Sequence, residues 1–444
     1  MGKQAAGLVL SLILLIGAPI SAFAASDDNT TGSGQHARTG ENLKSSFVDS
    51  GSLLPLKHLD LDTVLKRAVD NSYNLSLLQM KLTALSQNKD NLKKQQEDLG
   101  GATIVIGSGS LPSTPEEMMK AYGIPDDGTT PPDLWIVSDA VTNGVVNQVV
   151  NGVGAIAAAL NKQIASQREQ LELALEQLNT EQSNTLLDLE KAKTGAKLQI
   201  TSQYVQLLSL NKQVVLAEKY LDILKADHNR AVTLKKQAMG TAEAVILAQR
   251  QVREQEEQLD TLKDNYQLAL IQLCFDLGLV YDPEITLEDI AYTPEPITRK
   301  DTEGLLQNSY DMKQQWNAVV QANKQESHTT PANEHEEDYL DTMTRIADQQ
   351  AEQTRVELSK KISKTYSGAD TAYKAYQSAT QDLADAEEDY ANMEARYKNG
   401  FVSRYDFNKY SFTLTQQQLA LDLTRLQTFM ANEAVKAMEQ GLIN

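Results

Sequence analysis

The stretch TAEAVILAQRQVREQEEQLDTLKDNYQLALIQLCFDL, residues 241–277, has no proline and repeats its apolar side chains regularly. They return every seven positions, at Val245, Val252, Leu259, Tyr266 and Leu273. Between them lie mainly glutamine, glutamate, aspartate and lysine, so the other faces of a helix would be exposed to water. This pattern predicts a long helix that packs in a left-handed coiled coil.

The same repeat and the same lack of proline extend the prediction outward from this stretch. A second apolar row consists of Leu78, Leu85, Leu92 and Leu99, and residues 133–282 and 332–444 contain no proline. Proline breaks helices because it lacks an N–H donor and clashes with the preceding turn. We therefore predict an all-α-dominated fold of long antiparallel helices. The predicted helices span about 59–99, 157–238, 241–277, 302–326, 335–398 and 403–440.

The two halves of the chain share local signals, which indicates an internal repeat. The signals are Asn71-Ser72-Tyr73, Gly240 and Gly278 in the first half, and Asn308-Ser309-Tyr310, Gly400 and Gly441 in the second. In each half the two shorter predicted helices together match the middle one in length, so they can lie end to end along it. We assign residues 59–285 and 286–444 to two tandem helical repeats, with a small strand-containing insertion at 100–156 in the first.

The chain begins with the features of a secretory signal peptide. Lys3 precedes an apolar run at 8–16, and the small-residue pattern Ala22-Phe23-Ala24 follows. The run is shorter than the roughly 20 residues that cross a bilayer, which favours a cleaved signal over a retained anchor. Residues 1–24 are therefore predicted to direct export, and residues 25–58 to form a flexible polar leader.

Charge and side-chain chemistry exclude several classes of function. The net charge of −19 opposes binding to a phosphate backbone, so nucleic acid is not an expected partner. Cys274 is the lone cysteine, and the five histidines are too scattered for metal ligation by spacing. We find no nucleophile and base at a spacing that supports catalysis. The expectation is a protein that is not an enzyme and has no cofactor and no metal.

Parts of both repeats resemble one known family. Residues 61–68 (LDTVLKRA) and 71–75 (NSYNL) resemble the repeat-opening helix of the TolC family of outer membrane efflux proteins. Residues 396–403 (RYKNGFVS) resemble that family's glycine tip ahead of its last helix. The resemblance implies a homotrimer whose helical hairpins form a hollow α-barrel in the cell outer membrane and periplasm. It also implies a passive exit duct, coupled to an inner-membrane transporter through a periplasmic adaptor.

The same resemblance assigns roles to the two hairpin tips. In the family the tips contact the adaptor and narrow the tube, which here concerns Gly240, Thr241, Gly400, Phe401, Val402 and Ser403. The candidate aperture or gate residues are Asp406, Arg404, Lys409 and Glu243. Asp406 lies six residues after a tip glycine, where the family has an aperture acid, whereas Lys409 replaces the next acid. The alternative for Asp406 is a plain helix-start residue favoured by the helix dipole.

The sequence departs from the family at 100–156. The family takes four membrane strands from each chain, whereas this chain offers two strand-like runs, at 102–106 and 134–137. The corresponding turn of the second half, residues 326–334, is short and polar. Membrane contact through 100–156 therefore stays an open expectation. The alternative function is an exported structural coiled-coil rod of the cell envelope without a membrane barrel, located at the envelope surface.

Overall fold

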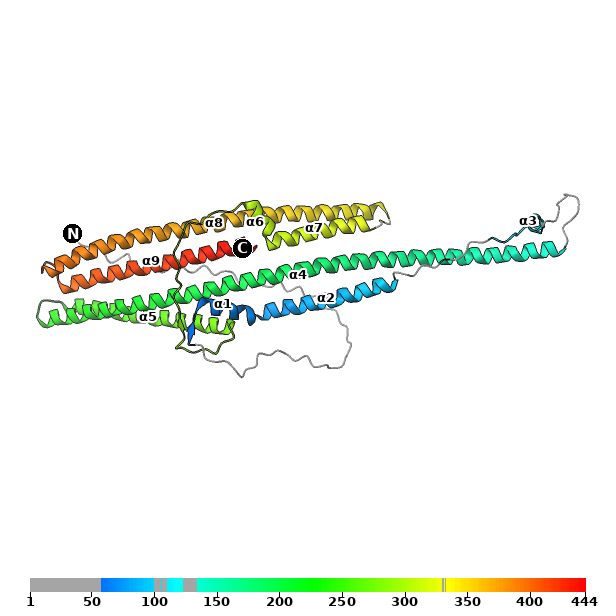
Figure 1. The fold of residues 1–444 in the computed structure, drawn as a ribbon. Coiled ribbons are helices and arrows are strands. Elements are labelled where there is room, and N and C mark those ends of the chain that lie inside the picture. Colours follow the sequence, from blue (N-terminus) through cyan, green and yellow to red (C-terminus); the bar gives the residue numbers. More distant parts are fainter. Residues whose placement is uncertain (1–56, 100–104, 106–109, 123–133, 330, 332) are drawn as a thin grey trace. The chain divides into compact units, whose positions relative to one another are not determined.

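The computed structural model describes residues 57–99, 105, 110–122, 134–329, 331 and 333–444 (Figure 1). Long helices make up most of these ranges. The helices are α1 Leu61–Asp70, α2 Tyr73–Leu99, α3 Pro115–Ala121, α4 Leu134–Lys236, α5 Ala242–Asp276, α6 Thr302–Asn308, α7 Tyr310–His328, α8 Glu334–Lys398 and α9 Arg404–Glu439. The strands are β1 His58–Leu59 and β2 Thr286–Leu287. The predicted signal peptide and nearly all of the predicted leader lie outside the described residues.

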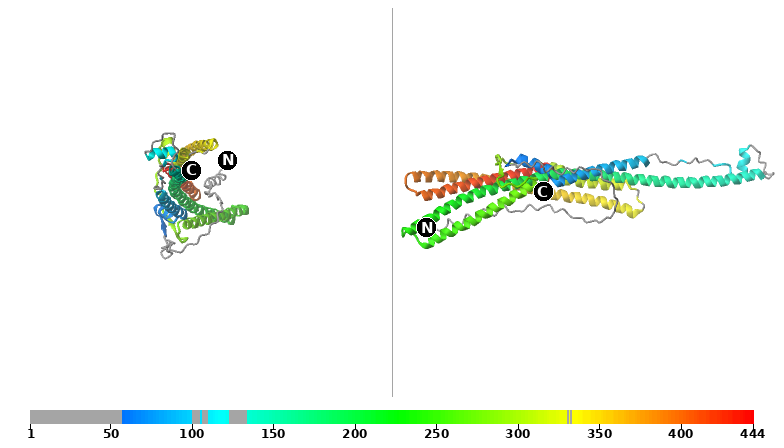
Figure 2. Two further views of the ribbon diagram at one scale, coloured as in Figure 1. Left: turned by 90° about the vertical axis from the view of Figure 1, so that its right-hand side faces the viewer. Right: turned by 90° about the horizontal axis from the view of Figure 1, so that it is seen from below.

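Helix α4 is the centre of the arrangement. It packs against α5 and α9 along its C-terminal half and against α2 and α7 farther toward its N-terminus (Figures 1 and 2). Helix α8 packs against α7 and α9. This series of neighbours corresponds to a layer of helices with α4 inside and α8 at one edge. The predicted fold class, an all-α-dominated chain of long antiparallel helices, is confirmed.

The seven-residue rows of the sequence lie on the packed faces of their helices. Leu259 and Leu273 of α5 are 6% and 0% exposed, and Leu85 of α2 is 9% exposed. Ala217 and Leu221 of α4 share a buried cluster with Leu259. Burial of a leucine side chain contributes about 1.5–3 kcal/mol. Both rows therefore form the seams that the heptad spacing predicted.

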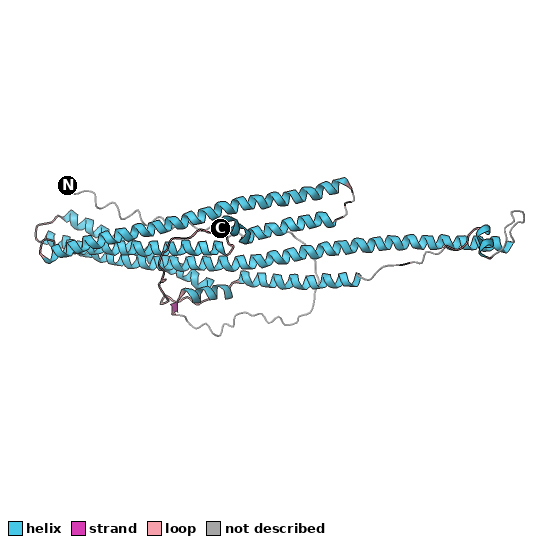
Figure 3. Cartoon of the chain, turned by 45° about the horizontal axis from the view of Figure 1, so that its top comes forward, coloured by secondary structure: helices cyan, strands magenta, loops and turns pink. Residues whose placement is uncertain are grey.

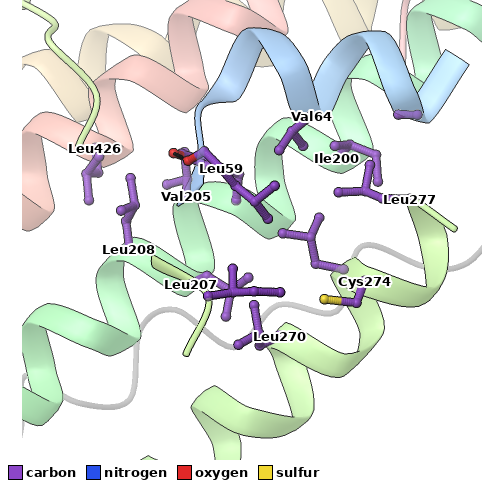
Figure 4. Packing of buried hydrophobic residues seen from close by; sticks show 14 of the residues in the cluster. Leu59, Val64, Ile200, Val205, Leu207, Leu208, Leu270, Cys274, Leu277 and Leu426 are labelled. Carbon is purple, nitrogen blue, oxygen red and sulfur yellow. Dashed lines mark hydrogen bonds between the residues drawn. The ribbon is translucent and has the colours of Figure 1, made fainter. Parts of the chain in front are cut away.

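The largest buried cluster joins the beginning of the described chain to the middle of the helical layer (Figure 4). Tyr204 of α4 is fully buried, and its hydroxyl lies 2.9 Å from the Leu59 carbonyl oxygen and 2.6 Å from the Glu288 carbonyl oxygen. Leu59 belongs to β1, and Glu288 directly follows β2, which pairs with β1 in parallel. This one hydroxyl therefore fastens both strands to α4. Burial raises the pKa of Tyr204, so the hydroxyl remains a proton donor. Other members of the cluster are Val64, Leu207, Leu270, Cys274 and Leu426.

The repeated sequence signals contact each other in both halves. Asn71 Nδ2 donates a hydrogen bond to the Leu277 carbonyl at 2.8 Å, at the end of α5. Asn308 Nδ2 donates likewise to the Glu439 carbonyl at 2.9 Å, at the end of α9. Gly441 has a φ of +110°, and a Cβ there would lie 2.6 Å from the Asn308 carbonyl oxygen. The repeat thus has a physical basis, whereas the assigned boundary between 285 and 286 stays a prediction.

Two helix boundaries differ from the sequence prediction. The helix predicted at 59–99 is divided into α1 and α2 at Asn71 and Ser72. Helix α4 begins at Leu134 instead of 157 and is 103 residues long, so it continues past the end of α2 (Figure 3). The predicted match in length between the middle helix and its two neighbours therefore fails in the first half.

The strand prediction for the insertion is wrong at 134–137, because these residues form the first turn of α4. Ile136 and Ala140 stand one helical turn apart and are both buried in a cluster with methionines of α3. Residues four apart share one face of a helix, so α3 covers one side of the first turns of α4. The other strand prediction, 102–106, lies outside the described residues except for Val105, which is not in a strand.

Candidate functional site

The two hairpin tips, between α4 and α5 and between α8 and α9, have the same backbone structure. Met239 and Phe401 each donate a backbone N–H to the carbonyl five residues earlier, at 2.9 Å in both tips. The residues before them, Ala238 and Gly400, have φ of 57° and 76°. This is the Schellman arrangement, in which one left-handed residue ends a helix. Ala238 is therefore the structural counterpart of Gly400.

Gly240 and Gly400, which the sequence prediction paired as the tip glycines, are not equivalent positions. Gly240 comes two residues after Ala238, and a Cβ there would lie 3.1 Å from the Leu234 Cβ. Gly240 permits a close approach of the turn to the end of α4, whereas Gly400 provides the left-handed conformation that glycine favours. The sequence comparison missed this shift because an alanine at the left-handed position gives no signal.

Each tip leads into the next helix through a hydroxyl cap. Thr241 Oγ1 accepts the Ala244 N–H at 3.1 Å, and Ser403 Oγ accepts the Asp406 N–H at 3.1 Å. The Ser403 hydroxyl also donates to the Asp406 carboxylate at 2.7 Å. The helix dipole favours an acid in this first turn. The geometry thus supports the helix-start alternative for Asp406, and an aperture role for it stays a prediction.

Both tips present one large apolar side chain to solvent. Met239 is 75% exposed and Phe401 is 78% exposed, at equivalent positions of the two turns. In Schellman motifs this position frequently packs on the preceding helix turn, which leaves these two side chains as exceptions. The sequence prediction included Phe401 but not Met239, because it aligned the tips on the glycines.

Four side chains connect the beginning of α9 to α4 near the second tip, and we call them the latch. Lys409 Nζ lies 3.7 Å from Asp227 Oδ2 and 4.4 Å from the centre of the Tyr405 ring. The Arg230 guanidinium carbon lies 4.0 Å from the centre of the same ring. Asp227 and Arg230 belong to α4, so the latch ties the second hairpin to the first.

The latch is electrostatically favourable but weak. Burial alone lowers the pKa of Lys409, but the Tyr405 contact and the charges of Asp227 and Asp406 raise it above its ordinary value. The Lys409 side chain is 51% exposed, so its ion pair contributes only about 0–1 kcal/mol. Each exposed cation–π contact adds about 0.5–1 kcal/mol. Asp227 Oδ1 is buried without a hydrogen-bond partner among the described residues, which offsets part of this gain.

Helix α9 is held more firmly farther from the tip. Lys212 Nζ of α4 lies 3.0 Å from Asp289 Oδ2 and 3.1 Å from Asp422 Oδ2. Arg425 Nη2 lies 3.1 Å from the same Asp289 oxygen. Burial lowers the pKa of Lys212, but its hydrogen bonds to the two acids raise it overall. Because Lys212 and Arg425 are only 22% and 24% exposed, this network is better shielded from water than the latch.

Aromatic contacts hold α8 and α9 together at the second tip. The rings of Tyr397 and Phe407 stack with centroids 4.9 Å apart, and Tyr390 lies 5.3 Å from the same phenylalanine. Farther along α9, Phe412 stacks on Tyr220 of α4 at 5.1 Å. Such pairs contribute about 0.5–1.5 kcal/mol beyond their buried area. The second hairpin is therefore stiff within itself near its tip.

The remaining predicted gate residues, Arg404 and Glu243, are exposed. In the ranges that the structure covers, neither forms an ion pair, and Lys409 pairs with Asp227 instead of Asp406. The sequence prediction missed the α4 side of the latch because α4 and α9 belong to different repeats. No spacing rule along the chain connects residues that far apart.

Other chemistry is sparse in the part of the chain that the structure describes. That part holds no group of three or more His, Cys, Asp or Glu side chains arranged to bind a metal. Within the same ranges, none of the helices combines the length and the apolar composition that crossing a membrane requires. The tips and the latch are therefore the candidate functional site.

Solved outer membrane channels share this fold. The chain is similar to the outer membrane protein VceC of Vibrio cholerae, with a TM-score of 0.54, 13% identity, and 86% of this chain and 96% of VceC covered. It is similar to the Campylobacter jejuni channel CmeC, with a TM-score of 0.55, 12% identity and 86% of each chain covered. For the open Neisseria gonorrhoeae channel MtrE, the TM-score is 0.52 and the identity 12%, with 86% of this chain and 89% of MtrE covered.

No protein-family model and no curated protein sequence matches the chain. At identities this low the structural likeness concerns the fold. The chain has the fold of these outer membrane channels, which confirms the resemblance to the TolC family at that level.

Proposed function

We propose that this protein is a passive exit duct for export or efflux across the cell envelope and works as a homotrimer. The observation that carries the proposal is the layer of long antiparallel helices, which has the fold of known outer membrane channels. Helices α5, α4, α9 and α8 lie side by side near the tips, so three copies place twelve helices in a ring. At roughly 10 Å spacing the ring is about 38 Å across, which leaves a water-filled lumen.

The edges of the layer support this assembly because they carry exposed apolar side chains. In a closed ring each edge meets the opposite edge of the next copy, and these side chains become buried. On the α2 and α5 edge they are Tyr73, Leu77, Met80, Leu268, Ile271 and Phe275, exposed by 44–85%. On the α8 edge they are Tyr339, Met343, Ile346 and Val356, exposed by 42–59%.

The tips are the proposed contact with a periplasmic adaptor, which couples the duct to an inner-membrane transporter. Met239 and Phe401 support this assignment because each places an exposed apolar side chain at the same point of its turn. Exposed apolar side chains often mark a protein-binding surface. Because they occupy the same position in both tips, one kind of partner could bind both tips in the same way. The surrounding contact residues are those predicted from the sequence: Gly240, Thr241, Gly400, Val402 and Ser403.

The aperture of the duct is proposed to lie at the same end, with the latch as the contact that breaks on opening. The Lys212 network anchors the far part of α9, whereas the latch holds its beginning weakly. The tip of the second hairpin can therefore leave α4 while the rest of α9 stays in place. In a trimer, Asp406, Arg404, Lys409 and Glu243 set the charge around this opening.

Export to the outer membrane and periplasm is the location that the predicted signal peptide and the fold support. The alternative, a coiled-coil rod at the envelope surface, rests on the short connection between α7 and α8. The described residues of this connection include no strand. A rod does not require the latch, because a rod has no aperture to close.

Mass and conductance, measured on the same purified protein, test the proposal. We expect a trimer by multi-angle light scattering and large, weakly selective channels in a planar bilayer. A trimer that never conducts supports the rod and contradicts the duct. A monomer in detergent and in detergent-free buffer contradicts both the assembly and the duct.

A further inference from the structure

The N-terminal part of α4 continues beyond its main helical neighbours. Arg168 Nη2 donates to the Leu99 carbonyl at 2.6 Å, which marks the end of α2 along α4. Residues 134–160, which we call the distal segment, precede this contact (Figure 3). The described parts of the chain that pack on the distal segment are α3 and residues 110–113.

One face of the distal segment is covered by its own chain. Asn143 Nδ2 donates to the Pro112 carbonyl at 2.9 Å. Asn147 accepts the Leu111 N–H at 2.8 Å and donates to the Leu111 carbonyl at 2.7 Å. The covered face therefore has satisfied polar groups and is fixed in orientation. Its residues are Ile136, Ala140, Asn143 and Asn147.

The opposite face carries apolar side chains that are exposed, and we call them the distal stripe. They are Val141, Val145, Val149, Ile156 and Leu160, exposed by 41–63%. At about 100° per residue, the centre of the stripe lies roughly 180° from the covered face. Val145 and Val149 recur as Ile156 and Leu160 eleven residues later. An 11-residue repeat is typical of helices that pack together in coiled coils.

The composition of the distal segment favours a second copy over a lipid surface. Within it, residues 140–160 contain no charged side chain and no Phe, Trp or Tyr, and Trp135 and Asp139 lie in its first turns. Helices that lie on membranes depend on Lys or Arg on the polar face and on Trp, Phe or Leu on the apolar face. Here the stripe is mainly valine. It is flanked by Val137, Val146 and Val153 and by asparagine, glutamine, threonine, alanine and glycine. Identical uncharged helices can approach without repulsion.

We propose that the distal stripe packs against the same stripe of other copies of this chain, forming a coiled coil beyond the hairpins. The inference rests on the proposed function, because it takes the homotrimer as its starting point. It adds a second contact between copies, separate from the edges of the helical layer. It also explains why this part of α4 carries exposed apolar side chains on the face opposite α3.

Disulfide trapping in the full-length protein tests this contact. Cys274 is the lone cysteine and is buried, so Cys274→Ala gives a background for single cysteines. We expect Val145→Cys and Val149→Cys to form disulfide-linked dimers under mild oxidation, since one cysteine per chain joins two copies. The matched control is Asn151→Cys, which is exposed on the same helix but lies about 130° from the stripe centre. We expect the stripe positions to cross-link at least tenfold more than the control.

The mass of each variant separates failure of this inference from failure of the proposed function. A trimer without preferential cross-linking at the stripe overturns the distal contact and leaves the duct assembly intact. The absence of any trimer overturns both. A polarity-sensitive fluorophore on Val145→Cys gives a further readout with neutral phosphatidylcholine vesicles. A blue shift that requires the vesicles makes lipid the occupant and overturns the contact between copies.

Discussion

The two hairpin tips have the same backbone turns and caps but differ in side chains. After the cap of the second tip come Tyr405, Asp406 and Lys409, which belong to the latch or the capping contact. At the equivalent positions after Thr241, the first tip has Glu243, Ala244 and Leu247. The two tips therefore share the backbone turn, whereas the latch side chains that reach the other hairpin come from the helix after the second tip.

This difference assigns separate mechanical roles to the hairpins. In the first hairpin α4 and α5 pack through their heptad seam, and α4 also provides the surface against which α9 lies. In the second hairpin an aromatic group stiffens the tip, and the weak latch ties it to α4. For the proposed duct, we infer that the first hairpin is the fixed part and that the second hairpin moves on opening.

The largest expected effect comes from Phe407, which contacts both Tyr390 and Tyr397. Phe407→Ala should lower the free energy of unfolding by about 2–3 kcal/mol, because it removes a half-buried ring and that ring's contacts with the two tyrosines. The equivalent change at the first tip, Val245→Ala, should cost about 1 kcal/mol. Urea unfolding followed by circular dichroism measures both. Equal losses would remove the distinction between the tips.

The left-handed positions offer a reciprocal pair of substitutions. Gly400→Ala should destabilise the protein by about 1 kcal/mol, and Ala238→Gly should stabilise it by a similar amount, because both positions have positive φ. The thermal unfolding midpoint should shift in opposite directions for the two variants. Shifts of the same sign would mean that the two turns are not equivalent.

The latch should influence opening more than stability. Lys409→Ala should change the free energy of unfolding by about 1 kcal/mol, which corresponds to roughly a fivefold change in an open-to-closed ratio. We expect a higher open probability in single-channel recordings. Leu247→Ala, the matched change at the first tip, should leave the recordings unchanged. If Lys409→Ala also behaves like wild type, the latch is not a gate.

The smallest effect is the pH dependence of the latch. Because the pKa of Lys409 is raised in the folded state, its contribution is fully present below the ordinary lysine pKa of about 10.4. The contribution is lost as the pH rises through the raised value. The stability difference between wild type and Lys409→Met should therefore be constant at neutral pH and shrink only in strong alkali. Urea unfolding midpoints of both proteins, measured at a series of pH values, give this difference. A change in the difference between pH 6 and 8 would contradict the assignment of the pH dependence to Lys409.

Local sequence signals determined the helices, since a heptad row and the absence of proline act within a few turns of chain. The helix predicted at 241–277 is α5, Ala242–Asp276, and the one predicted at 335–398 is α8, Glu334–Lys398. The repeated Asn-Ser-Tyr and glycine signals were visible in the sequence, but their cause is tertiary, because Asn71 and Asn308 each close a helix end that lies 206 and 131 residues farther along the chain.

Only the tertiary structure decided the features that depend on contacts between distant segments. Residues 134–137, whose apolar composition had suggested a strand, are the first turn of α4, and Ile136 and Ala140 pack on α3 there. The left-handed turn placed an alanine, Ala238, where the repeat led us to expect glycine. The latch exists because α9 lies beside α4, which brings Lys409 to Asp227 from another repeat. Periodicity describes the face that a helix buries, whereas the identity of its neighbour is set by the packing of the whole layer.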